Sequence, residues 1–154
     1  MAKIFFSYKR EESPQVKIIV EGLIQAGHSV FWDAKLRAAA DFIQKLNHEL
    51  LAADCVIVAW SRQSITSPWV ISECIKGFHR QVLLPVRIDG VTDHEIPMPF
   101  NILQCVDLSV WKGNRSDLAW MNLCSDITAL TSKHVDHPNV RIDEEEDASV
   151  PFVN

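Results

Sequence analysis

The sequence lacks a long hydrophobic run. Its longest uninterrupted apolar stretch, Cys55 to Trp60, is far shorter than the roughly 18 residues of a membrane span. The apolar start of the chain turns polar at Ser7, too early for a signal peptide. We therefore expect no transmembrane helix, no membrane as partner and a cytoplasmic protein.

The sequence also lacks paired cysteines. None of the four forms a CxxC pair, and each lies inside an apolar pattern, so a disulfide framework or a zinc knuckle is not expected. We predict that they are small core residues: Cys55, Cys74, Cys105 and Cys124.

The body of the chain has no surplus of charge. Residues 1–133 hold 14 basic and 14 acidic residues, whereas residues 134–154 hold one arginine and six acids, which accounts for the net charge of −5. A body without a basic excess argues against nucleic acid as partner, and its low net charge favours self-association. We predict one domain over 1–133 and an acidic linker or tail over 134–154 that leads to a further domain in the natural protein.

Several motifs of known chemistry are missing. The chain has no GxGxxG, HExxH or GxSxG, so zinc-protease and serine-hydrolase functions have no support. The segment Gly22 to Ser29 approaches a phosphate-binding loop, but His28 stands where that loop needs lysine, and we interpret Gly27 as a helix C-cap. His134 and His137 have no ligand partners at fixed spacing, and no metal site is expected.

What the sequence does contain is an alternation of short β-branched or aromatic runs with helical patterns. This alternation predicts an α/β fold with a flavodoxin-like five-stranded parallel sheet, order 2-1-3-4-5, and helices on both faces. The expected strands are 3–7, 29–32, 54–60, 82–88 and 105–108.

Helix signals lie between and after these strands. Ser13-Pro14 and Ser67-Pro68 are typical helix starts, a further helix begins at Asp41, and the last covers about 116–131. Residues 96–100 predict a loop in place of a fourth crossover helix. Apolar positions expected to face inward are Phe42, Ile43, Leu46 and Leu50 in the second helix and Val70, Ile71, Cys74, Ile75 and Phe78 in the third. The last helix is apolar on most sides, through Leu118, Trp120, Met121, Leu123, Ile127 and Leu130.

In such a sheet the ligand crevice lies at the carboxyl ends of strands one and three, where the strand order reverses. Glu73 follows Trp69 by four residues, so both share one face of a helix that starts at this crevice. The spacing alone leaves two interpretations open. Glu73 is either a site carboxylate or, more in line with common surface patterns, an exposed partner of Lys76 or Lys9.

Five segments in order resemble the Toll/interleukin receptor (TIR) domains, most closely their bacterial branch. They are Lys3-Ile4-Phe5-Phe6-Ser7-Tyr8-Lys9-Arg10-Glu11, Val30-Phe31-Trp32-Asp33, Ala53 to Ser61, Ser67-Pro68-Trp69-Val70-Ile71-Ser72-Glu73 and Leu84-Pro85-Val86-Arg87-Ile88-Asp89.

The resemblance implies a flavodoxin-like fold and cleavage of NAD, as substrate rather than cofactor, at the bond between nicotinamide and ribose. It makes Glu73 the catalytic residue. Lys9, Arg10 and Arg37 would hold the pyrophosphate, and Trp69 would stack on or enclose the nicotinamide. The remaining residues expected around the ligand are Phe6 and Tyr8 on the first loop and Asp33, Lys35 and Leu36 on the second.

A single carboxylate suffices for this chemistry. Nicotinamide leaves a cationic pyridinium as a neutral base, so no proton donor is needed, and the carboxylate stabilises the oxocarbenium-like ribose. The resemblance favours an NAD glycohydrolase or cyclase in an antiphage defence effector, fused to a sensor domain and active on assembly with other TIR domains. The alternative is a non-catalytic TIR–TIR interaction module. Ala38-Ala39-Ala40 stands where the second loop usually carries proline and glycine. Alanine favours helix and does not adopt positive φ without strain, so we expect the three alanines to stiffen this loop.

Overall fold

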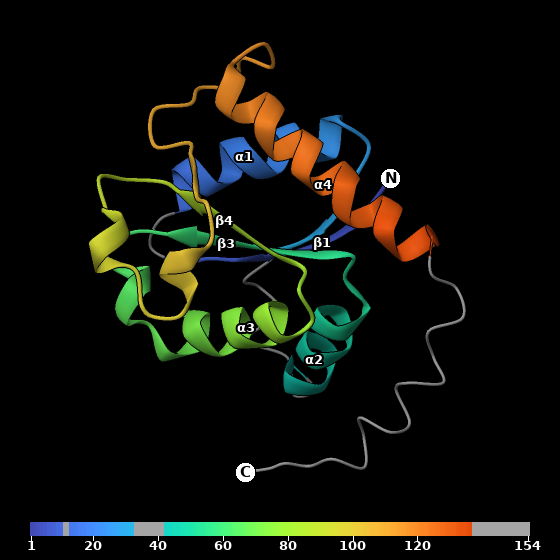
Figure 1. The fold of residues 1–154 in the computed structure, drawn as a ribbon, viewed down its shortest axis with the longest axis horizontal. Coiled ribbons are helices and arrows are strands. Elements are labelled where there is room, and N and C mark those ends of the chain that lie inside the picture. Colours follow the sequence, from blue (N-terminus) through green and yellow to red (C-terminus); the bar gives the residue numbers. More distant parts are fainter. Residues whose placement is uncertain (11–12, 33–41, 137–154) are drawn as a thin grey trace.

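A computed structural model describes residues 1–10, 13–32 and 42–136, and its centre is a parallel sheet of five strands in the order β2-β1-β3-β4-β5 (Figure 1). The sheet and its helices form the flavodoxin-like α/β fold that the sequence predicts. The strands are β1 (Lys3–Ser7), β2 (Ser29–Phe31), β3 (Cys55–Trp60), β4 (Leu83–Arg87) and β5 (Val106–Asp107).

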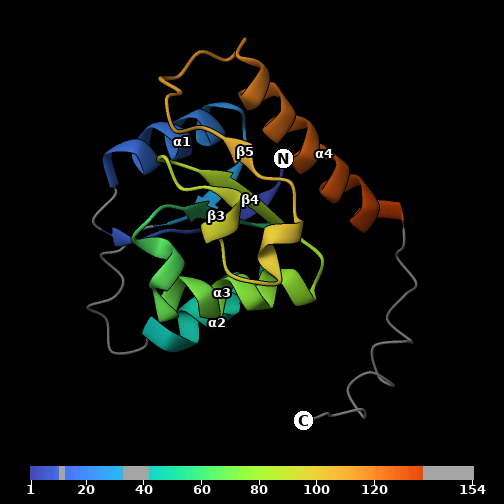
Figure 2. The same cartoon turned by 60° about the vertical axis from the view of Figure 1, so that its left-hand side comes forward.

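Helices cover both faces of the sheet. One face carries α1 (Ser13–Gln25) and α4 (Leu118–Asp136), and the other carries α2 (Phe42–Ala52) and α3 (Pro68–His79), as both cartoon views show (Figures 1 and 2). The stretch after β4 is a loop with two single-turn 3₁₀ helices, η4 (Asp93–Glu95) and η5 (Phe100–Ile102), as expected for this crossover. Among the described residues, no helix has the length and apolar character to cross a bilayer.

Alternating side chains divide the core into two layers. Ile4 and Phe6 of β1 face α1 and α4, whereas Phe5 and Ser7 face α2 and α3, because neighbouring residues of a strand point to opposite faces. All six residues of β3 are buried, as a strand at the middle of a parallel sheet requires. Burying a large apolar side chain contributes roughly 1.5–3 kcal/mol, so both layers stabilise the fold.

The four cysteines are free thiols in or beside this core. Burial raises the pKa values of Cys55, Cys74 and Cys105 to about 12. A thiol with so high a pKa is a poor nucleophile, and these residues pack as small apolar side chains.

The glycine-rich segment at the end of α1 is a helix cap. Gly27 has a φ of 98°, its N–H donates to the Ile24 carbonyl at 3.0 Å, and the His28 N–H donates to the Leu23 carbonyl at 3.2 Å. This pair of bonds is a Schellman motif, which confirms the C-cap interpretation. Gly22 serves packing instead, because an added Cβ would lie 2.8 Å from the ring of Trp120.

Two predicted inward positions are wrong, because Ile43 is 55% exposed and Ile75 is 43% exposed. Leu118 and Met121, on the helix that is apolar on most sides, are exposed as well. Each helix rests on the sheet along one stripe only, so an apolar residue at the edge of a wide pattern stays outside the contact.

Several elements differ by a few residues from the sequence-based bounds, and in α4 and β5 a side chain accounts for one of the differences. α4 starts at Leu118, because the Asp117 side chain accepts the Ala119 N–H at 2.9 Å and caps the helix, and it continues to Asp136, past the expected domain boundary at Lys133. β5 ends at Asp107, whose carboxylate accepts both the N–H and the hydroxyl of Ser109 and turns the chain.

Candidate active site

The carboxylate of Glu73 lies inside the molecule at the carboxyl end of the sheet. Glu73 is 5% exposed, and its Oε1 accepts a hydrogen bond of 2.6 Å from the hydroxyl of Ser7, the last residue of β1. β1 lies between β2 and β3, so this is the point where the strand order reverses. The sequence left two interpretations of Glu73 open, and the interpretation as an exposed surface carboxylate is therefore wrong.

Serine hydroxyls build the turn that leads from β3 into α3. The Ser61 N–H donates to Ser64 Oγ at 2.8 Å, the Ser64 N–H donates to Ser61 Oγ at 3.0 Å, and the Ser64 hydroxyl donates to the Ala59 carbonyl at 2.9 Å. A 3₁₀ turn, η3 (Ser64–Thr66), follows, and Ser67 then caps α3 by accepting the Val70 N–H at 3.3 Å, with Pro68 in the first turn. These bonds set the start of α3, and with it the place of Glu73.

Trp69 lies in the first turn of α3, half-buried, one turn before Glu73. Its indole stacks on the ring of Phe42, the first residue of α2, with 5.4 Å between the centroids and 16° between the planes. Phe42 thus covers one face of the indole, so a ligand ring cannot stack on that face.

The residues expected on the first loop divide into two groups. Lys9 is half-buried and Arg10 is exposed, directly after Ser7 and Tyr8 at the carboxyl end of β1. Phe6 is instead a residue of β1, buried in the core layer under α1 and α4, because strand alternation turns it away from the α3 side. Tyr8 packs in that same layer, and its hydroxyl donates to the Trp32 carbonyl at 3.0 Å.

Asp33, Lys35, Leu36 and Arg37, with the three alanines that follow them, lie outside the described residues.

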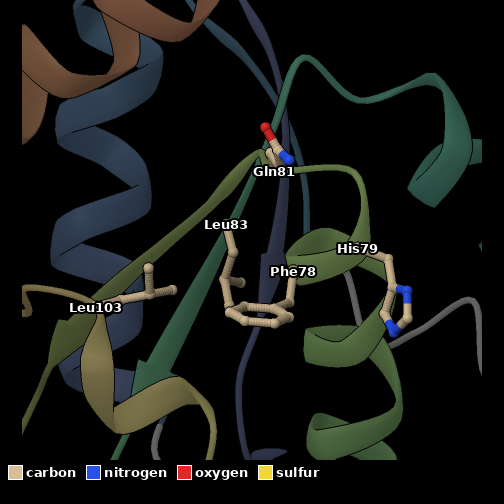
Figure 3. A pocket seen from close by; sticks show the side chains of 5 residues that line it. All are labelled: Phe78, His79, Gln81, Leu83 and Leu103. Atoms are coloured by element: carbon tan, nitrogen blue, oxygen red, sulfur yellow. The ribbon is translucent and has the colours of Figure 1, made fainter.

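Two hollows of the described part of the chain lie away from Glu73. One, of about 410 Å³, opens at the far end of α3, where the apolar side chains of Phe78, Leu83 and Leu103 face one another and His79 and Gln81 stand at the margin (Figure 3). The other, of about 390 Å³, runs between β5 and α4. Neither is lined by Ser7 or Glu73, and we place the candidate site by its carboxylate and its position in the sheet rather than by the size of a hollow.

No group of three or more histidine, cysteine, aspartate or glutamate side chains suited to a metal ion occurs in the described ranges 1–10, 13–32 and 42–136. The described residues of the candidate site supply the carboxylate of Glu73, the hydroxyl of Ser7, the indole of Trp69 and the cationic side chains of Lys9 and Arg10.

Ser7 is the residue of this site that sequence reasoning missed. A signal was present, because Ser7 stands two residues after Phe5 and so shares its core-facing side of β1. A polar residue at such a position needs a buried partner, and Glu73 is that partner.

The fold and this site define a doubly wound α/β domain with a buried carboxylate at the switch point. The family model of the TIR domain matches residues 4–123, and the chain belongs to the TIR domain family. No curated protein matches the sequence.

Solved structures show the same fold. The TIR domain of the Toll-related receptor TRR-2 from Hydra magnipapillata superposes with a TM-score of 0.66 at 17% identity, over 83% of this chain and 99% of that one. A metazoan TIR-STING receptor from C. gigas, solved in complex with 2′,3′-cGAMP, gives a TM-score of 0.62 at 19% identity, over 84% of this chain and 39% of that one.

Proposed function

We propose that this TIR domain cleaves NAD at the bond between nicotinamide and ribose, as a glycohydrolase or cyclase, and that it serves a bacterial antiphage defence effector. The observation that supports this most is the buried Glu73 carboxylate, hydrogen-bonded to Ser7 at the switch point of the sheet. A domain used only for docking has no need to bury a carboxylate there, since burying a charge is costly.

The reaction needs one anionic group at the ribose. The C1′–N1 bond breaks with both electrons going to the pyridinium nitrogen, so nicotinamide leaves neutral and C1′ becomes cationic. Glu73 would stabilise that cation electrostatically. Attack of water on C1′ with loss of a proton then gives ADP-ribose, and attack by a nitrogen of the adenine gives a cyclic product.

Binding would use groups that follow β1 or lie in the first turn of α3. Lys9 and Arg10 would supply positive charge for the pyrophosphate, and Trp69 would contact the nicotinamide. The residues 33, 35, 36 and 37 remain part of the proposal on the strength of the family resemblance.

The decisive experiment measures nicotinamide release from NAD by concentrated protein. We expect Glu73→Gln to lower the rate by about two orders of magnitude or more, the scale of losing a preorganised electrostatic stabiliser. Glu21→Gln is a matched control, because it makes the same chemical change at an exposed glutamate of α1. A Glu73→Gln rate of about half the wild-type value or more would refute the assignment.

We further propose that activity depends on assembly with other copies of the domain. Specific activity should then fall steeply on dilution, with the dilute monomer nearly inactive, because a neighbour completes the site. Measuring nicotinamide release over about a hundredfold range of protein concentration tests this. Constant specific activity across the range would mean that the monomer is complete.

A further inference from the structure

We propose that Ser7 is a positioning residue, whose hydroxyl holds the Glu73 carboxylate in one place and in its charged form during the reaction. The inference rests on the proposed cleavage of NAD and assigns a role to a residue outside the set that the family resemblance supplies.

The first support is geometric. The 2.6 Å between Ser7 Oγ and Glu73 Oε1 lies in the range of a hydroxyl that donates to an ionised carboxylate. Ser7 is 1% exposed, so water does not compete for this bond.

The second support is the rigidity of the strand that carries the hydroxyl. Ser7 pairs with Val58 of β3, and β1 has hydrogen-bonded neighbours on both sides. Glu73 comes from another element, α3, and its side chain has three torsions of its own. A fixed donor on the sheet therefore defines where the carboxylate oxygen lies, which the helix alone does not.

The third support is the charge that the reaction requires. Burial disfavours an ionised carboxylate, whereas a donated hydrogen bond favours it. The oxocarbenium-like ribose gains only from the ionised form. Ser7 would thus act on the chemical step through Glu73, and not on NAD binding.

The test compares the wild type with three variants by kcat, KM and the pH profile of NAD cleavage. For Ser7→Ala we expect kcat to fall about 10- to 100-fold at neutral pH, the usual worth of a hydrogen bond to a charged group. KM should change little, and the acidic limb of the profile should move to higher pH. Ser7→Thr keeps the hydroxyl and should restore kcat and the position of the acidic limb.

Thr131→Val is the matched control. It removes a half-buried hydroxyl of α4, on the opposite face of the sheet, that donates to the Ile127 carbonyl at 2.9 Å and not to Glu73. It should leave kcat and the acidic limb unchanged.

An unchanged acidic limb in Ser7→Ala would overturn the proposal. A second result would overturn it too: a loss of kcat in Ser7→Ala as large as that in Glu73→Gln, together with a covalent ribosyl–serine adduct on the wild type. In that case Ser7 itself would attack C1′ and pass its proton to Glu73.

A second measurement separates this proposal from the proposed function. The ¹³C signal of the Glu73 side-chain carboxyl, assigned with Glu73→Gln, is titrated in wild type and Ser7→Ala without NAD. A midpoint at higher pH in Ser7→Ala supports the positioning role, and identical midpoints overturn it. If the wild type released no nicotinamide, the proposed cleavage of NAD would be refuted, whereas the titration would still test the contact between Ser7 and Glu73.

Discussion

The two ends of helix α3 are built for different purposes. Its start carries a serine cap and a stacked indole, and one turn later Glu73, a carboxylate whose burial opposes stability. At its end, Arg80 donates to the carbonyls of Leu50 and Ala53 at 2.8 Å each and fastens the end of α2. The same helix therefore carries a site that destabilises the fold at its start and a packing contact that stabilises the fold at its end.

The end of α3 also repeats the cap of α1 with a different residue. The Gln81 N–H donates to the Phe78 carbonyl and the Val82 N–H to the Gly77 carbonyl, both at 3.0 Å, which is again a Schellman motif. Gln81 has a φ of 61°, where α1 uses Gly27 at 98°. The α3 cap therefore carries a backbone strain that the α1 cap avoids.

The largest effect is expected at the start of α3, where Glu73→Gln should separate activity from stability. NAD cleavage falls by about two orders of magnitude, while the melting temperature stays the same or rises. The glutamine carbonyl still accepts the Ser7 hydroxyl, and the cost of burying a charge is gone. Thermal unfolding followed by circular dichroism measures this, and a large drop would show that Glu73 serves the fold.

The next effect is expected near the end of α3, from Gly77→Ala. An added Cβ would lie 2.8 Å from Cβ of Val56, which is fully buried in β3. We expect a loss of about 1–3 kcal/mol in the free energy of unfolding, from denaturant titration. Gly90→Ala is the control, because the nearest atom to its added Cβ is 3.8 Å away. Equal stability of the two variants would contradict the tight contact.

A smaller effect, of opposite sign at the two caps, follows from the paired Schellman motifs. Gln81→Gly should stabilise the protein by about 0.5–1 kcal/mol, because glycine adopts positive φ without strain. Gly27→Ala should destabilise it by about 1 kcal/mol. If the two denaturation midpoints moved in the same direction, side-chain contacts would outweigh the effect of backbone strain at one of the caps.

The smallest effect concerns pH at the end of α1. His28 Nδ1 accepts the Ala2 N–H at 3.1 Å, and burial, with the nearby Met1 amino group, lowers the pKa of His28. The unfolded state then binds a proton more readily than the folded state. The contribution of neutral His28 to the free energy of unfolding is therefore present above about pH 6.5 and is lost as pH falls below that value. The loss of stability between about pH 7.5 and 5.5 should be smaller in His28→Gln than in wild type. His48→Gln is the control, because it makes the same change at an exposed histidine of α2, and it should behave as wild type. Parallel losses in all three proteins would assign the acid sensitivity elsewhere.

Much of the fold could be predicted because its signals are local. The apolar run of β3, the Ser67-Pro68 start of α3 and the Gly27 cap each follow from the preferences of a few adjacent residues. The limits of helical patterning appear at Ile43 and Ile75, whose exposure depends on how far each helix face is covered by the sheet.

The sequence by itself determined the strand order, the helix that carries Trp69 and Glu73 and the end of the sheet where they lie, because periodicity and caps fix elements, and alternating elements fix a doubly wound topology. Only the tertiary structure decided that Glu73 is buried, that Phe6 faces away from it and that Ser7 donates to it. Ser7 and Glu73 are 66 positions apart, and no local preference can specify a contact between two elements that meet only when the helix packs on the sheet.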